Sequence, residues 1–115
     1  MKKIILFICL LSFGYPLLAQ DSSLYLRETF IRNGDTLRYR ILYPENAKKR
    51  KAYPLLVFLH GSGERGNDNA LQLLHGGDLF LKEEVRRQFP AVVIFPECPE
   101  KAAWSVFPHR RDDTA

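Results

Sequence analysis

The stretch that decides the fold runs Leu55-Leu56-Val57-Phe58-Leu59 and continues directly into His60-Gly61-Ser62-Gly63-Glu64-Arg65-Gly66. Five consecutive apolar residues between a proline and a glycine-rich segment are typical of a strand that is covered on both faces, in a sheet with flanking helices. In open α/β sheets, ligands bind outside the carboxyl ends of the strands. The glycine-rich segment therefore follows the strand at the place where a ligand would bind.

A second apolar run, residues 91–95, lies between Pro90 and Pro96. About 30 residues separate the two runs, which is enough for the crossover helix that parallel neighbours require. We expect that helix at residues 79–88, with Asp78 as its N-cap, because acidic residues lie near its start and basic residues near its end. The two runs therefore predict a parallel β-α-β unit.

Residues 25–31 and 36–43 predict an antiparallel hairpin. Asn33-Gly34 lies between them, and both residues tolerate the positive φ angles of a type I′ turn. The period-two pattern of the second strand predicts one apolar face, formed by Leu37, Tyr39, Ile41 and Tyr43. The predicted fold class is an α/β sheet that begins with an antiparallel hairpin at its edge.

The composition is that of an ordinary globular protein. The chain has 115 residues, of which 46% are hydrophobic and 26% charged, and these values argue against disordered and collagen-like classes. The formal net charge is +4, but Lys2 and Lys3 lie in the N-terminal segment, so residues 20–115 carry only +2. The only dense basic cluster, residues 48–51, is interpreted as a solvated loop. We expect no nucleic-acid partner.

Residues 1–19 have the pattern of a cleavable signal peptide. Two lysines precede an apolar stretch at residues 4–18, which is shorter than the roughly 20 apolar residues of a bilayer span. Ala19 supplies a small residue for cleavage before Gln20. We expect export to the periplasm or the cell exterior, without a stable membrane anchor.

Cleavage would leave Cys98 as the only cysteine. We expect a buried thiol there, because free cysteines are usually buried. The three histidines, His60, His75 and His109, show no metal-ligand spacing with it. We therefore expect neither a disulfide within residues 20–115 nor a metal site.

The sequence of residues 53–67, followed by residues 95–99 and Trp104, resembles the α/β-hydrolase superfamily. The resemblance is to bacterial secreted esterases of the carboxylesterase, phospholipase and feruloyl-esterase-like group. It implies that residues 25–31, 36–43, 55–59 and 91–95 are the first four strands of a hydrolase sheet. Residues 20–115 would then be the N-terminal portion of the domain. The implied activity is serine-type hydrolysis of a carboxylic ester substrate, without a metal or organic cofactor.

The resemblance also implies roles for the glycine-rich segment. Gly61, Ser62 and Gly63 would form an oxyanion loop, with the Ser62 N–H as one donor. His60, Glu64 and Arg65 would support that loop. An ion-pair network of Glu64, Arg65 and Asp68 and a plain solvated loop both remain open for the acidic and basic side chains. Trp104 would line a substrate pocket or belong to the core.

The nucleophile elbow of this family, G-x-S-x-G, is absent from the chain. Ser62 has His60 and Glu64 at the flanking positions where the elbow needs glycine, and Ser105 has no glycine nearby. His109, followed by two aspartates, is interpreted as part of a solvated charged end. We therefore expect the catalytic triad beyond Ala115 and expect the chain alone to be inactive.

Two other functions remain open. The chain could be a non-catalytic exported binding or interaction module on a truncated hydrolase scaffold. It could also belong to a serine peptidase of the prolyl-oligopeptidase type, which shares the hydrolase domain. The sequence does not decide the substrate or the oligomeric state.

Overall fold

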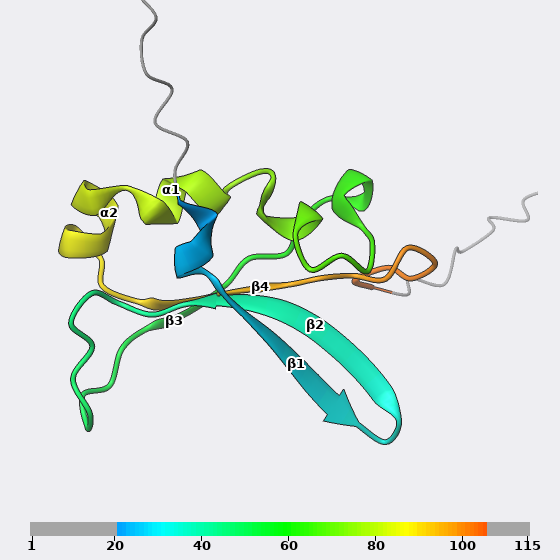
Figure 1. Ribbon diagram of the computed structural model, residues 1–115, viewed down its shortest axis with the longest axis horizontal. Helices are drawn as coiled ribbons and strands as arrows, with labels where there is room; N and C mark the ends of the chain where they lie inside the picture. The colour runs from blue at the N-terminus through cyan, green and yellow to red at the C-terminus, as the bar shows by residue number, and fades with distance from the viewer. Residues whose placement is uncertain (1–20, 106–115) are drawn as a thin grey trace, which may run out of the picture.

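The computed structural model describes residues 21–105, which form one four-stranded mixed sheet and several short helices (Figure 1). The strands are β1 (Leu26–Arg32), β2 (Asp35–Leu42), β3 (Leu55–Val57) and β4 (Val92–Pro96); the helices are α1 (Gly77–Leu81), α2 (Glu83–Gln88) and the single 3₁₀ turns η1 (Ser22–Leu24), η2 (Ser62–Glu64) and η3 (Leu71–Leu73). The strand order is β1-β2-β4-β3. Strand β2 is antiparallel to β1 and to β4, whereas β3 and β4 are parallel. The α/β sheet with an antiparallel edge hairpin is confirmed.

The β1–β2 hairpin forms because its turn residues accept left-handed backbone angles. Asn33 has φ of 52° and Gly34 has φ of 84°, the pair of positive angles that a two-residue type I′ turn requires. The register runs from Leu26 opposite Ile41 to Arg32 opposite Asp35. The hairpin predicted from the local sequence is confirmed, with β1 starting one residue later than expected.

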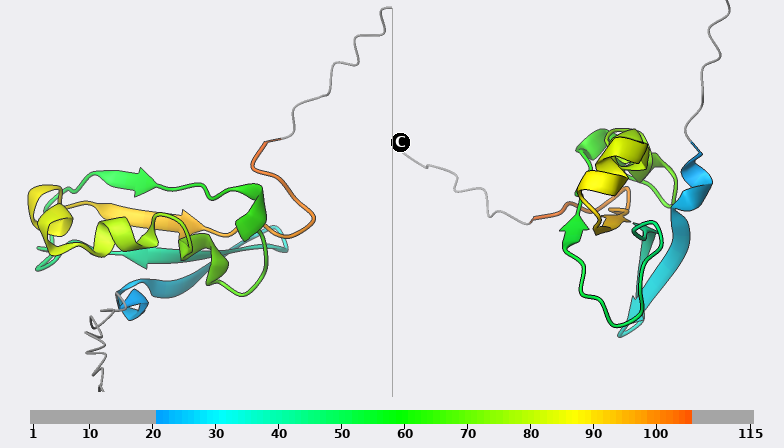
Figure 2. Two further views of the ribbon diagram at one scale, coloured as in Figure 1. Left: turned by 90° about the horizontal axis from the view of Figure 1, so that it is seen from above. Right: turned by 90° about the vertical axis from the view of Figure 1, so that its left-hand side faces the viewer.

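The helical segments between β3 and β4 lie together on one face of the sheet (Figure 2). Within residues 21–105, no helix covers the opposite face. Leu55, Val57 and Leu59 are therefore 62%, 52% and 54% exposed, while the alternating Leu56 and Phe58 are half-buried against the core. The expectation that this strand is covered on both faces is wrong for the described part of the chain.

The core lies between the sheet and the helices and is centred on Phe95, which is fully buried. Its ring stacks on Phe58 at 4.7 Å between centroids and makes edge contacts with Tyr25 and Phe80 at 5.4 and 5.8 Å. Such aromatic pairs add to the stabilisation from burial alone. The cluster holds the end of β3, the middle of β4 and helix α1 together.

The face of β2 that points to the helices differs from the predicted one. Arg40 lies opposite Phe95 and Leu42 lies opposite Val93, so Arg40 and Leu42 share the core-facing side and are 5% and 3% exposed. The predicted apolar face, Leu37, Tyr39, Ile41 and Tyr43, is the other one. Arg40 is accommodated in the interior because its Nη2 donates to the carbonyl of Ser22, at 3.2 Å.

The expected single helix at residues 79–88 is two helices. Lys82 has an extended backbone with ψ of 128° and separates α1 from α2. Arg86 holds α2 against the end of β2 by donating to Glu45 and to the carbonyl of Tyr43. Asp78 lies in the first turn of α1, and the N-cap is Gly76 with φ of 97°, so the predicted cap is wrong.

Gly76 also permits close packing on the core. A Cβ atom there would lie 2.8 Å from the ring of Phe58, so only glycine fits without displacing that ring. No helix within residues 21–105 is long and apolar enough to cross a membrane. The expected leader, residues 1–19, lies outside the described residues.

Candidate active site

The segment after β3 turns sharply and leaves two backbone N–H groups at the surface. Gly61 is extended, with φ of −76° and ψ of 176°, and leads into the single turn η2. Ser62 and Gly63 are exposed. In residues 21–105, neither of their N–H groups donates to a protein acceptor. The loop of residues 60–69, called here the 60–69 loop, thus presents free donors at the carboxyl end of β3.

The ring of His60 fixes the start of the 60–69 loop through two hydrogen bonds. Its side chain is buried, and its Nε2 accepts a hydrogen bond from the N–H of Cys98 at 2.9 Å. Because that nitrogen accepts, the proton of the neutral ring belongs on Nδ1, which donates to the carbonyl of Gly61 at 2.7 Å. The ring therefore fixes the peptide plane that precedes Ser62.

Trp104 also contacts His60, through a hydrogen bond and through its ring. Its indole N–H donates to the carbonyl of His60 at 2.9 Å, and the two rings meet edge to face at 5.1 Å between centroids. The side chain remains 38% exposed. Residues 102–104 thereby fold back onto the loop and contact it directly.

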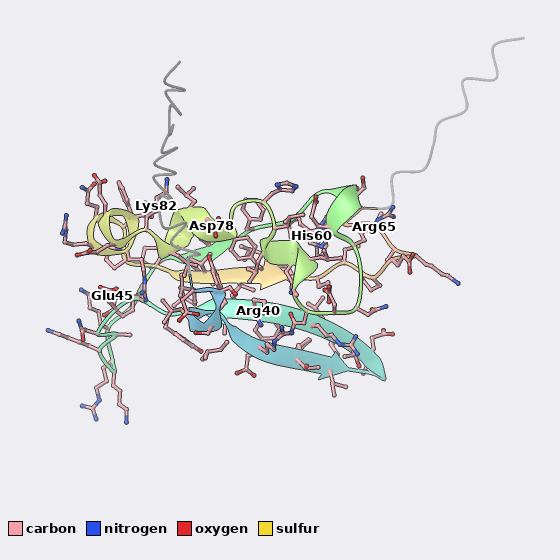
Figure 3. All side chains as sticks on the ribbon, turned by 45° about the horizontal axis from the view of Figure 1, so that its top comes forward. Arg40, Glu45, His60, Arg65, Asp78 and Lys82 are labelled. Carbon is pink, nitrogen blue, oxygen red and sulfur yellow. The ribbon has the colours of Figure 1, made fainter. Side chains whose placement is uncertain are left out.

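Arg65 links the backbone of Ser62 to the C-terminal part of the described chain through two carbonyls. Its Nε donates to the carbonyl of Ser62 at 2.9 Å, and its Nη1 donates to the carbonyl of Ala102 at 3.0 Å. Figure 3 shows His60 and Arg65 at the same end of the sheet, and Glu45 and Lys82 at the other. Ser62 is therefore held through its carbonyl while its N–H stays free.

Of the two alternatives left open for Glu64, Arg65 and Asp68, the ion-pair network is not the one that forms. Glu64 pairs with the exposed side chain of His75 at 3.3 Å, and among residues 21–105 Arg65 donates to two carbonyls. Asp68 instead accepts the N–H groups of Ala70 and Leu71 through Oδ1, in an Asx-type turn just before η3. Each side chain thus stabilises a different part of the loop.

A buried polar cluster closes the far end of the 60–69 loop, and sequence reasoning missed it. Asn69 is 7% exposed and has φ of 52°. Its N–H donates to Oε2 of Glu97 at 2.9 Å, its Nδ2 donates to the carbonyl of Tyr39 at 3.3 Å, and its Oδ1 accepts from Gln72. Arg27 donates to its carbonyl at 3.0 Å. The sequence signal that was available is an asparagine in a polar run, since asparagine tolerates a left-handed backbone.

The two carboxyl groups of this cluster have opposite pKa shifts. Burial, and then the contact with Asp68, raise the pKa of the Glu97 carboxyl group above its ordinary value. Hydrogen bonding from the backbone N–H of Leu71 lowers the pKa of Asp68. Since each group contributes to the pKa shift of the other, the shifts belong to one pair of interacting groups.

Several predicted features can be placed directly. Cys98 is a free, buried thiol, as expected. In residues 21–105, no group of three or more histidine, cysteine, aspartate or glutamate side chains is arranged to hold a metal ion. Ser105 ends the described part of the chain, and His109 with the aspartates after it lies outside.

The sheet order and the position of the loop define a mixed α/β fold, consistent with a partial α/β-hydrolase fold. The crystal structure of a thermostable esterase is similar to this chain, with a TM-score of 0.68 and 35% sequence identity over 73% of the chain. The chain spans 24% of the length of that esterase. No family model and no curated protein sequence matches the chain.

Proposed function

We propose that the chain provides the oxyanion loop of an exported serine-type carboxylic ester hydrolase, with the Ser62 N–H as one of two oxyanion donors. The observation that carries the proposal is the exposed residue Ser62 in the turn after β3, whose N–H has no protein acceptor among residues 21–105. Donors that are fixed before the reaction stabilise a developing oxyanion without having to reorganise. The similarity to a thermostable esterase supports the choice of ester chemistry.

The contacts around Ser62 suit that role. His60 fixes the preceding peptide through the carbonyl of Gly61, and Arg65 holds the carbonyl of Ser62 itself. The two contacts restrict the backbone on both sides of the N–H, and both are made to carbonyl oxygens, so neither uses the N–H itself. A donor of this kind is directed at a substrate oxygen, and the loop needs no side-chain chemistry to supply it.

The remaining catalytic groups are proposed to come from sequence beyond Ala115. In this class, the second donor is the N–H that follows the nucleophilic serine of a G-x-S-x-G elbow. That serine would attack the ester carbonyl while a histidine takes its proton, giving an acyl-enzyme that water then hydrolyses. Ser62 itself has a buried histidine and a glutamate at the flanking positions of the elbow, so we assign it a backbone role only.

A matched pair of substitutions at Ser62 tests this assignment. Ser62 is the first residue of η2 and follows an extended Gly61, and both features suit a proline at position 62. In the product of the complete reading frame, Ser62→Pro removes the N–H and should lower kcat for p-nitrophenyl acetate by about 10²- to 10³-fold. Ser62→Ala keeps the N–H and should retain activity.

Two outcomes would contradict the assignment. A Ser62→Pro variant with unchanged kcat and an intact circular dichroism spectrum would show that this N–H is no donor. An inactive Ser62→Ala variant would instead make the hydroxyl group essential and point to Ser62 as the nucleophile.

Two observations favour the alternative, a non-catalytic binding module. One face of β3 is apolar and exposed. A hollow of about 540 Å³ also lies at the amino ends of β3 and β4, away from the 60–69 loop, and is lined by residues 51–56 and 88–91. A complete product that binds a partner there but neither hydrolyses esters nor reacts with a fluorophosphonate would favour this alternative.

A further inference from the structure

Glu97 follows β4 directly, and its carboxyl group is almost fully buried. The residue is 2% exposed. Its Oε2 accepts the N–H of Asn69, but its Oε1 is buried without a hydrogen-bond partner. Burying an ionised oxygen without a donor is costly, because the charge loses its hydration and gains nothing in return. The unpartnered oxygen therefore needs an explanation.

Asp68 is the neighbour that supplies one. Its carboxyl group accepts the N–H groups of Ala70 and Leu71, while that of Glu97 accepts the N–H of Asn69, so the two carboxyl groups bind consecutive N–H groups of one turn. Those donors favour the ionised form of Asp68. A protonated carboxyl group carries one O–H donor, so a proton on Glu97 would satisfy its Oε1 and remove the repulsion between two like charges.

We propose that Glu97 is a positioning residue of the 60–69 loop: its protonated Oε1 donates to the Asp68 carboxylate while its Oε2 accepts the N–H of Asn69. When the loop closes, the Glu97 carboxylate forms an O–H bond with a proton given up by hydronium or a buffer acid of the solvent, and no covalent bond within the chain is broken. The effect of this contact on catalysis rests on the proposed function, whereas the contact itself does not.

The surrounding charges agree with a proton at this position. Burial and Asp68 raise the pKa of Glu97, and the pKa of Asp68 is lowered. Arg27 is a charged group beside this pair, and it donates to the carbonyls of Asp68 and Asn69. The ring of His60 reaches this region only through the N–H of Cys98. In residues 21–105, neither side chain donates to the Glu97 carboxyl group.

The contact between Glu97 and Asp68 matters because residues 97 and 98 bind the 60–69 loop at three points. The N–H of Cys98 donates to His60 at the start of the loop, the N–H of Gly66 donates to the carbonyl of Cys98 at 3.1 Å in its middle, and Glu97 accepts from Asn69 at its end. Loss of the proton would place two negative charges at the last of these points. The end of the loop would then open first as the pH rises.

The test measures the titration of Glu97 and its effect on folding in the full 115-residue chain. A raised pKa means that the folded state keeps the proton above pH 4.5, the ordinary value for glutamate. The unfolding equilibrium constant of the wild type should then increase as the pH rises above that value, by at most about tenfold per pH unit for one proton, until the folded-state pKa is passed.

Glu97→Gln is the conservative variant. Its amide has the same shape and can donate to Asp68 and accept from Asn69 at every pH, so it should abolish this increase and be more stable than the wild type at pH 7. Asp68→Asn should lower the pKa of Glu97, as read from its carboxyl ¹³C shift, because the like charge is gone. The amide hydrogen of Asn69 should exchange faster at high pH in the wild type but not in Glu97→Gln.

Three results would overturn the proposal. Glu97 could titrate at or below pH 4.5 in the wild type. The Glu97→Gln variant could be less stable than the wild type at pH 7 and keep the same pH dependence. Calcium chloride at neutral pH could stabilise the wild type but not Glu97→Gln, which would assign the free oxygen to a cation. These readouts need no ester hydrolysis, so they stand or fall separately from the proposed function.

Discussion

Asn69 is the residue whose replacement gives the most informative change in stability. Its side chain donates to the carbonyl of Tyr39 and accepts from Gln72. Its backbone is left-handed, with φ of 52°, a conformation that asparagine and glycine tolerate better than other residues. Two substitutions at position 69 can therefore measure separately the free energy lost with the side-chain hydrogen bonds and the free energy cost of the left-handed backbone.

The magnitudes follow from these contacts. Asn69→Gly keeps the backbone conformation but leaves the amide of Gln72 without its acceptor, and Gln72 is fully buried with its Oε1 already unpartnered. Stranding a buried donor costs about 1–3 kcal/mol. Asn69→Ala adds the left-handed strain of about 1–2 kcal/mol, partly offset by a less flexible unfolded chain. A domain with about 5–15 kcal/mol of stability would register both changes.

Urea denaturation of the 115-residue chain measures both free energies. Circular dichroism reports the sheet, and the fluorescence of Trp104, the only tryptophan, reports the 60–69 loop through its contact with His60. The exposed Asn67 in the same loop serves as the control, and Asn67→Ala should change the stability by less than about 0.5 kcal/mol. Equal costs for glycine and alanine would refute the strain argument. If Asn69→Gly and Asn69→Ala each lowered the free energy of unfolding by less than about 0.5 kcal/mol, the role of Asn69 in closing the loop would be refuted.

The remaining predictions concern the other residues of the loop. His60→Ala should destabilise the chain by about 1–3 kcal/mol, because the N–H of Cys98 loses its acceptor, and should shift the emission of Trp104 to the red; unchanged emission would contradict the contact. Because the pKa of Asp68 is lowered on folding, its contribution is present above pH 3.8 and is lost as the pH falls through its folded-state pKa; Asp68→Asn should lose this acid sensitivity in urea titrations between pH 2 and 5. The 115-residue chain should neither hydrolyse p-nitrophenyl acetate above background nor react with a fluorophosphonate, as judged by mass spectrometry; a labelled Ser62 would reverse its assignment.

The parts of the fold that could be predicted depend on short-range chemistry. Asn33-Gly34 specifies its turn through the backbone angles of two adjacent residues. The apolar runs around Val57 and Val93 identify the parallel pair, because their length and flanking prolines are local signals. The glycines that follow β3 also predicted a turn there, and Gly61 leads into the single turn η2.

The parts that could not be predicted depend on partners far away in the sequence. Asn69 and Glu97 are 28 residues apart, and no local pattern pairs them. The face of β2 that points to the core was misjudged because Arg40 is held inside by a carbonyl of η1, a contact that hydrophobic periodicity does not register. The break at Lys82 was not predicted either, and Arg86 in the helix after it contacts the distant Glu45.

The central claim is that the N–H of Ser62 donates to the oxyanion of a reacting ester. The most direct measurement compares ¹H–¹⁵N spectra of the complete product before and after reaction with diethyl p-nitrophenyl phosphate, which leaves a phosphoryl oxygen where the oxyanion would be. We predict that the amide proton of Ser62 shifts downfield and exchanges more slowly with water in the adduct, while that of the control residue Asn67 is unchanged. A Ser62 amide with the same shift and exchange rate in both states would contradict the claim.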